Sequence, residues 1–147
     1  MATAGDELRN PVTGQTLVFR RTAADTGGEL LEVESVWEPG GAGPLAHFHP
    51  SQEERFTVLE GTITVEIDGE RRELAEGDEL VVPPRTPHSM WNAGSGRARA
   101  AWVTAPALRT EEFFAAAWGL AAAAHEGEQV DGAALLQEYS DVFRLAT

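Results

Sequence analysis

Between residues 55 and 84 the chain is a series of short β-like runs, each closed by turn residues: RFTVLEG, TITVEI, DGERREL and EGDELVVPP. In the second run Ile63, Val65 and Ile67 alternate with polar side chains, which predicts a strand with one buried and one solvated face. The Asp68-Gly69 pair is a strong hairpin signal, because both central residues of a type I′ turn need a positive φ. The pattern predicts an antiparallel, all-β domain.

The character of the chain changes at both ends of this β-rich part. Residues 1–16 are polar and rich in turn residues, which predicts an arm that is ordered only where it docks. Strand candidates run from residue 17 to residue 105. After Pro106 helix formers dominate, and residues 106–147 are expected to form two helices, the first with Thr110 as its N-cap and Gly127 after its end. We therefore expect an arm (1–16), a β domain (17–105) and a helical extension (106–147).

Composition excludes several kinds of chemistry and partner. The 147 residues include no Cys, so disulfides, thiolate ligands and a thiol nucleophile are unavailable, and all 11 Lys and Arg positions are Arg, which rules out a lysine Schiff base. A formal net charge of -13 argues against nucleic acid, whose binding needs a basic face. With no secretory signal and no apolar run near about eighteen residues, we expect a cytoplasmic protein without a membrane partner.

The stretch HFHPSQEERFTVLEG, residues 47–61, holds candidate metal ligands. Side chains alternate along a strand, so His47 and His49 should lie on one face. The same alternation places Glu54 with the apolar side chains of Phe56 and Val58, facing the core. Burying an unpaired carboxylate there would cost free energy, which predicts that a cation lies beside Glu54. Glu53 is the alternative ligand, but the alternation directs it outward.

A second half of the candidate site lies in GDELVVPPRTPHSMWN, residues 77–92. The prolines form a rigid turn that delivers His88 onto a new strand, whose inward set would be His88, Met90 and Asn92. Three imidazoles and the Glu54 carboxylate make a set of borderline ligands for one divalent transition metal. Such ligands suit Fe, Mn, Co, Ni, Cu or Zn and do not choose among them.

These residues resemble the two signature motifs of the cupin superfamily, in particular those of small single-domain cupins. The first motif is Gly, five residues, His-x-His, four residues, Glu, six residues and Gly, and it is matched by Gly41, His47, His49, Glu54 and Gly61. The second is Gly, five residues, Pro-x-Gly, two residues, His, three residues and Asn, and it is matched by Gly77, Pro83, His88 and Asn92. Arg85 stands where the second motif has its central Gly, which puts the shape of that turn in doubt.

The resemblance covers residues 17–105 and implies a conical cupin-type β-barrel, a jelly roll or double-stranded β-helix, with the metal inside and the two C-terminal helices outside it. Many cupin-like proteins bind no metal, so a metal-free barrel is the alternative. Inward-facing side chains beside the metal are candidates for a substrate pocket, although core packing explains them equally well: Trp37, Phe56, Val65 and Met90. Arg85 would hold an anionic substrate group or would be a solvated turn residue.

A metal with four protein ligands keeps two adjacent positions, so the first hypothesis is a metal-dependent enzyme acting on a small organic substrate. Glu54 would be the catalytic base, a role seen among the dioxygenase cupins that the sequence resembles. A quercetinase-like dioxygenase is preferred over a polyketide-cyclase or isomerase-type cupin, and a binding barrel without catalysis is the other alternative. We expect a homodimer, because the arm and the helices have apolar surface to bury. The aromatic stripe of the helices is expected to pack on the barrel or on a second subunit, and a lid over the cavity is the alternative.

Overall fold

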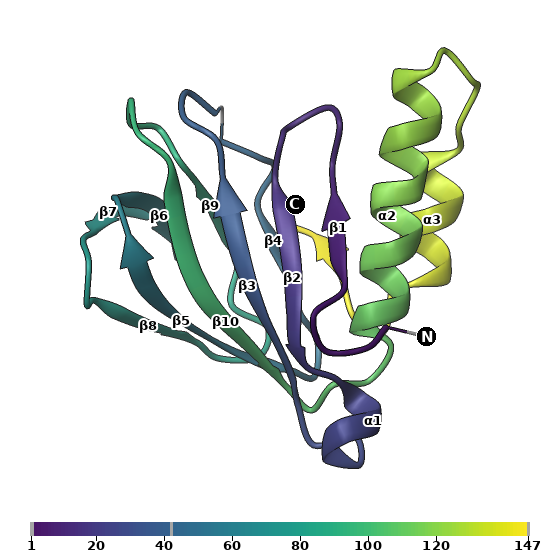
Figure 1. The fold of residues 1–147 in the computed structure, drawn as a ribbon. Coiled ribbons are helices and arrows are strands. Elements are labelled where there is room, and N and C mark those ends of the chain that lie inside the picture. The colour runs from purple at the N-terminus through teal and green to yellow at the C-terminus, as the bar shows by residue number, and fades with distance from the viewer. Residues whose placement is uncertain (1, 42, 147) are drawn as a thin grey trace.

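The computed structural model describes residues 2–41 and 43–146 of the chain. Two antiparallel sheets face each other, with strand orders β1-β2-β3-β10-β5-β8 and β11-β4-β9-β6-β7 (Figure 1). The larger sheet consists of β1 (Glu7–Arg9), β2 (Thr16–Arg21), β3 (Leu31–Trp37), β10 (Ala98–Ala105), β5 (Glu53–Glu60) and β8 (Glu79–Val82). The smaller sheet consists of β11 (Arg144–Leu145), β4 (His47–Phe48), β9 (His88–Trp91), β6 (Ile63–Ile67) and β7 (Glu70–Leu74). The predicted all-β architecture is confirmed.

The two predicted C-terminal helices are present as α2 (Thr110–His125) and α3 (Gly132–Glu138), and a short α1 (Ala23–Thr26) follows β2. The predicted N-cap is wrong by one residue: Arg109 occupies the cap position without a capping side chain. The Thr110 hydroxyl instead accepts a 2.7 Å hydrogen bond from Nε2 of the buried Gln52, which ties the start of α2 to the barrel. Among the helices that the structure describes, none is both long and apolar enough to cross a membrane.

The β6–β7 hairpin shows how local sequence sets the fold. Asp68 and Gly69 both have positive φ, at 52° and 80°, as the predicted turn requires. In β6, Ile63 and Val65 are fully buried and Ile67 is nearly so. The register pairs Ile63 with Leu74 and Ile67 with Glu70, so the hairpin is regular along its whole length. The predicted turn and the burial of Ile63, Val65 and Ile67 are confirmed, but Thr64, opposite Trp91 in β9, is buried as well, so the other face of the strand is not solvated throughout.

Two hydrophobic clusters lie on the same face of the larger sheet, because Trp102 is opposite Phe56 of one cluster and Val33 of the other in the strand register. The first fills the space between the sheets and includes Phe56, Ile63, Val65 and Leu80. The second packs the outer strands against the C-terminal helices. Its members are Leu17, Phe19, Leu31, Val33, Ala107, Phe113, Phe114, Tyr139 and Val142. Trp102 contacts both clusters, so it links the barrel interior to the helical extension.

Both ends of the chain add a strand to a sheet. In the N-terminal arm β1 pairs with β2, with Leu8 opposite Leu17, so the arm is ordered by docking on its own domain. At the other end β11 pairs with β4, with Leu145 opposite His47. The helical extension therefore ends in a strand. A strand of two residues is too short to show an alternating pattern in the sequence. Figure 1 shows β11, in yellow, running back from α3 towards β4, and both of its residues are exposed.

Arg85 has a backbone conformation that glycine adopts readily. Its φ is +62°, in the left-handed region that disfavours residues with a Cβ. Its backbone N–H donates a 2.9 Å hydrogen bond to the His49 carbonyl, a bond that any residue except proline can make. The side chain is exposed, and its nearest polar partner is the Pro50 carbonyl at 3.4 Å from Nε. The doubt about the local turn is thereby resolved.

We expect Arg85→Gly to raise the free energy of unfolding by about 0.5–1 kcal/mol, because it removes left-handed strain and loses only weak contacts. Chemical denaturation of the metal-free protein measures this change. Arg72→Gly is the matched control, since Arg72 is an exposed residue in the extended strand β7. The control should lose about 0.5–1 kcal/mol. A loss of stability at Arg85 as large as that at Arg72 would contradict the account of the turn.

Candidate metal centre

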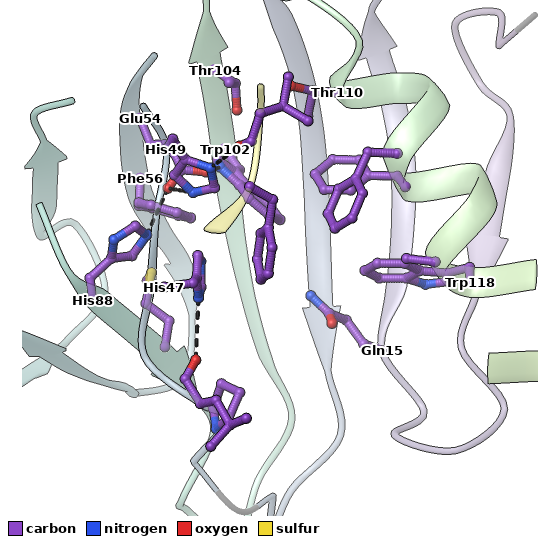
Figure 2. A pocket seen from close by; sticks show the side chains of 18 of the residues that line it. Gln15, His47, His49, Glu54, Phe56, His88, Trp102, Thr104, Thr110 and Trp118 are labelled. Carbon is purple, nitrogen blue, oxygen red and sulfur yellow. Dashed lines mark hydrogen bonds and ion pairs between the residues drawn. The ribbon is translucent and has the colours of Figure 1, made fainter. Parts of the chain in front are cut away.

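The structure brings three histidines together on one side of the barrel interior (Figure 2). His47 lies in β4 directly opposite His88 in β9, so strand register fixes this pair. His49 follows β4, and its ring centroid lies 5.1 Å from that of His47 and 5.2 Å from that of His88. One ligand nitrogen from each ring lies within 4.8 Å of those of the other two. The three imidazoles can therefore share one small cation.

Glu54 reaches the histidines from the opposite sheet. Its Oε1 lies 2.9 Å from Nε2 of His49 and 2.9 Å from Nε2 of His88. Its Oε2 accepts a 2.8 Å hydrogen bond from the indole nitrogen of Trp102. Only 1% of Glu54 is exposed, whereas the neighbouring Glu53 is an exposed residue. The structure thus places Glu54, and not the alternative Glu53, beside the imidazoles.

Backbone carbonyls hold the Nδ1 atom of each imidazole. Nδ1 of His49 lies 2.7 Å from the Val142 carbonyl and that of His88 lies 2.8 Å from the Thr86 carbonyl. His47 makes a longer contact of 3.4 Å with the Leu45 carbonyl. A carbonyl oxygen only accepts, so Nδ1 carries the proton and a neutral ring has its lone pair on Nε2. Such fixing of the ring by a backbone acceptor is typical of metal-binding histidines.

The contacts of Glu54 with two imidazoles require a cation. With Nδ1 protonated, the Nε2 lone pairs of His49 and His88 face one carboxylate oxygen, which is repulsive unless protons or a metal ion lie between them. Nε2 of His49 is buried and, despite its distance of 2.9 Å from Glu54, has no hydrogen-bond partner among the described residues. Three imidazoles with one carboxylate fit a divalent transition metal and leave its identity open.

Burial and the neighbouring charges together set the protonation of the cluster. Burial would raise the pKa of the Glu54 carboxyl, but the imidazoles of His49 and His88 outweigh burial and hold this pKa well below its usual range. Burial, assisted by the neighbouring imidazoles, lowers the pKa of His47 to about 3. Burial alone would also lower the pKa of His49, but the Glu54 carboxylate outweighs burial and raises it. Near neutral pH Glu54 is therefore ionised and His47 is neutral.

A cavity of about 390 Å³ opens beside the four residues. Three of the expected pocket residues, Trp37, Phe56 and Met90, line this cavity. The expectation for Val65 and Arg85 is corrected, because neither is among the lining residues. Val65 is fully buried within the core between the sheets, and Arg85 is exposed in the turn before β9. With Arg85 outside, no cation from that turn faces the interior of the cavity.

Two contributions add to the predicted ligands: the first was not predicted from the sequence, and the second was expected only as an alternative. Trp102 lies opposite Phe56 in the register of β10 and β5, and its ring stacks on Phe56 with centroids 5.2 Å apart. Alternation with the buried Ala98 and Ala100 would have directed Trp102 inward. The second contribution is a wall of the cavity made by the helical extension, whose members are Thr110, Phe113, Phe114, Ala117, Trp118, Val142, Phe143 and Leu145. The helices therefore cover the cavity as well as packing on the barrel.

Other motif residues shape the backbone around the site. Gly61 has a φ of +76°, and a Cβ there would lie 2.6 Å from the Arg97 carbonyl oxygen. Asn92 is buried, and its amide nitrogen donates 2.8 Å to the Gly96 carbonyl while its Oδ1 accepts from the Gly94 N–H. Asn92 thus closes the turn after β9 and is absent from the cavity wall. These positions support the strands that carry the histidines.

Comparisons with known proteins include a family model that matches the part of the chain that carries these motifs. Residues 33–104 match the family model described as a Cupin domain. A quercetin 2,3-dioxygenase of Bacillus subtilis is 35% identical over 85 residues, which make up 58% of this chain and 23% of that protein. An uncharacterized protein of Methanocaldococcus jannaschii is 39% identical over 57 residues, which make up 39% of this chain and 46% of that protein.

A solved structure shows the same arrangement of strands. KdgF from a Halomonas species has a TM-score of 0.59 at 22% identity, with 67% of this chain and 84% of that chain covered. At this identity the likeness concerns the fold alone. The chain spans less than half the length of the two curated relatives described above. The family match ends at residue 104, before the two helices and β11.

Proposed function

Because residues 33–104 of this chain are a cupin domain, we propose that the protein is a divalent-metal-dependent enzyme acting on a small organic molecule, with a quercetinase-like dioxygenase reaction. One observation carries the proposal: three imidazoles and a buried carboxylate converge at the wall of a 390 Å³ cavity. The similarity to the Bacillus subtilis quercetin 2,3-dioxygenase supports the choice of reaction.

The proposed metal would be held by His47, His49, His88 and Glu54. It would supply Lewis acidity and, where the metal is redox-capable, access to dioxygen chemistry. Glu54 would act as the general base that takes the proton of a substrate hydroxyl, whose acidity the metal would raise. Trp102 holds the other carboxylate oxygen at 2.8 Å and so directs Oε1 towards the histidines.

The cavity walls favour an apolar, planar substrate. The walls carry few polar groups and several aromatic rings, which belong to Trp37, Phe56, Trp102, Phe113, Phe114, Trp118 and Phe143. Flat rings of this kind bind planar molecules by stacking and exclude water from the reacting groups. Figure 2 shows Trp118 and Gln15 at the end of the cavity away from the histidines. A substrate that reaches both ends would place its acidic hydroxyl beside Glu54.

Oxygen uptake with a flavonol such as quercetin tests the proposal. Protein reconstituted separately with Fe, Mn, Co, Ni, Cu and Zn should consume one O₂ per substrate cleaved with at least one redox-capable metal. Glu54→Gln, which keeps the shape of the side chain but removes the base, should reduce kcat by about 100-fold or more. Turnover that proceeds equally under nitrogen would replace the oxygenase by a cyclase or isomerase. Saturable binding without turnover across a panel of enols and catechols would overturn the enzyme and leave a binding barrel.

A further inference from the structure

The last part of the chain contacts two of the three histidines. We call residues 139–146 the strap; they run from the end of α3 through β11. The Val142 carbonyl accepts the 2.7 Å hydrogen bond from Nδ1 of His49. The Phe143 ring stacks on His47, with centroids 4.5 Å apart and planes 22° from parallel. The strap therefore fixes one imidazole by a hydrogen bond and another by packing.

The strap is held in place by contacts on both sides of these residues. At its start the Arg109 guanidinium makes two hydrogen bonds to the Asp141 carboxylate, at 2.6 and 3.1 Å. Val142 is only 2% exposed and belongs to the core between the sheet and the helices. At its end β11 pairs with β4, and the Ala146 N–H donates 2.9 Å to the Ala46 carbonyl. The strap thus lies along the same strand that carries His47.

We propose that the strap completes the metal centre, with Val142 and Phe143 as positioning residues for His49 and His47. This inference rests on the metal site of the proposed function. It concerns a segment outside the residues that match the cupin model, which end at 104. Phe143 also lines the cavity, so docking of the strap sets the ligand geometry and closes one wall of the substrate site together.

The physical reason is the orientation of the rings. Without the Val142 carbonyl, Nδ1 of His49 would lose its hydrogen-bond acceptor. The ring could then rotate and direct either nitrogen towards the metal. Without Phe143 the His47 ring would lose a flat neighbour that restricts its rotation. Acceptors and neighbours that orient ligand rings typically change metal affinity by about 10–100-fold. If the docked strap raises metal affinity, bound metal must stabilise strap docking by the same factor, because the coupling is reciprocal.

The first test measures Zn²⁺ and Co²⁺ affinity by competition with a chromophoric chelator. Phe143→Ala should bind both metals about tenfold more weakly than the parent and should change the visible spectrum of bound Co²⁺. Phe143→Tyr, which keeps the ring, should restore both properties. Trp118→Ala is the matched control, because it removes a larger ring from the same cavity and contacts Phe114 rather than a histidine. Its metal affinity should equal that of the parent.

The second test needs no variant, so it stands even if Phe143→Ala fails to fold. Amide hydrogen exchange of the parent is followed with and without saturating Zn²⁺. Exchange in residues 142–146 should slow by about tenfold on metal binding, as the reciprocal coupling requires. The Gly28 amide, which donates to the Ala23 carbonyl at the end of α1, is the internal reference and should not change.

The outcomes separate the strap from the proposed function. A parent that binds no metal after reconstitution overturns both. A parent that binds metal tightly, with no change in strap exchange and with full affinity in Phe143→Ala, overturns the strap proposal and leaves the metal centre intact. Weaker binding in Phe143→Ala together with slower strap exchange in the parent supports the proposal, whichever substrate the enzyme uses.

Discussion

His49→Ala is expected to reduce the metal content of the purified protein from near one ion per chain to a few per cent of that value. His49 supplies an Nε2 that is buried, lies 2.9 Å from Glu54 Oε1 and has its Nδ1 fixed on the Val142 carbonyl. Loss of the ring removes a ligand of the cation that would compensate the buried Glu54 carboxylate. The affinity should fall by more than about 100-fold, beyond the effect of losing an outer partner.

Elemental analysis of untagged protein, grown in medium containing several transition metals, measures this effect. His125→Ala is the matched control, because His125 is an exposed residue at the end of α2 and should leave the metal content unchanged. Equal metal in His49→Ala and the parent would show that the metal is bound elsewhere. The identity of the metal then directs the assay: Fe, Mn, Co, Ni or Cu favours oxygen chemistry, whereas Zn favours cyclisation or isomerisation.

Trp102→Ala is expected to lower the free energy of unfolding by about 4 kcal/mol, the largest loss of stability predicted for a single site residue. The indole joins the two hydrophobic clusters, stacks on Phe56 and lies 5.2 Å, centroid to centroid, from Phe114. It also donates the hydrogen bond to Oε2 of Glu54. The substitution therefore leaves a void between the barrel and the helices and an unpaired oxygen on a buried carboxylate.

Trp102→Phe separates these two effects, since phenylalanine keeps much of the stacking area and removes the N–H. We expect a loss of about 2 kcal/mol, the cost of one hydrogen bond to a charged group. Both variants are measured by urea unfolding at neutral pH in the presence of a chelator, with circular dichroism as the probe. Equal stability of Trp102→Phe and the parent would show that the indole nitrogen does not hold Glu54, and a loss below about 1 kcal/mol in Trp102→Ala would contradict the packing account.

Local sequence predicted most of the barrel because its strands obey short-range rules. The β6–β7 hairpin follows from the alternation of Ile63, Val65 and Ile67 and from the Asp68-Gly69 turn, which depend only on neighbouring residues. The inward direction of Glu54 follows in the same way from its place two residues before Phe56. The N-cap of α2 was predicted at Thr110, but a long-range hydrogen bond with Gln52 uses that hydroxyl instead.

The pocket residues were less predictable than the ligands. Alternation along a strand predicts the face on which a side chain lies, but not which other side chains it contacts. Val65 and Met90 lie opposite each other in the register of β6 and β9, yet only Met90 lines the cavity. Val65 faces the core between the sheets, where other side chains cover it. The aromatic stripe of the helices was expected to pack on the barrel or on a second subunit, with a lid as the alternative. The structure shows that Phe113 and Phe114 both pack in the core and line the cavity.

The sequence by itself determined the candidate ligands, since the spacing of His47, His49, Glu54 and His88 and the two-residue period of a strand direct all four side chains inward. The tertiary structure alone decided what surrounds them. Trp102 on Glu54, Val142 on His49 and Phe143 on His47 are contacts between residues 48, 93 and 96 positions apart. Such contacts depend on how sheets and helices pack across the core, and no local rule specifies a neighbour at that separation.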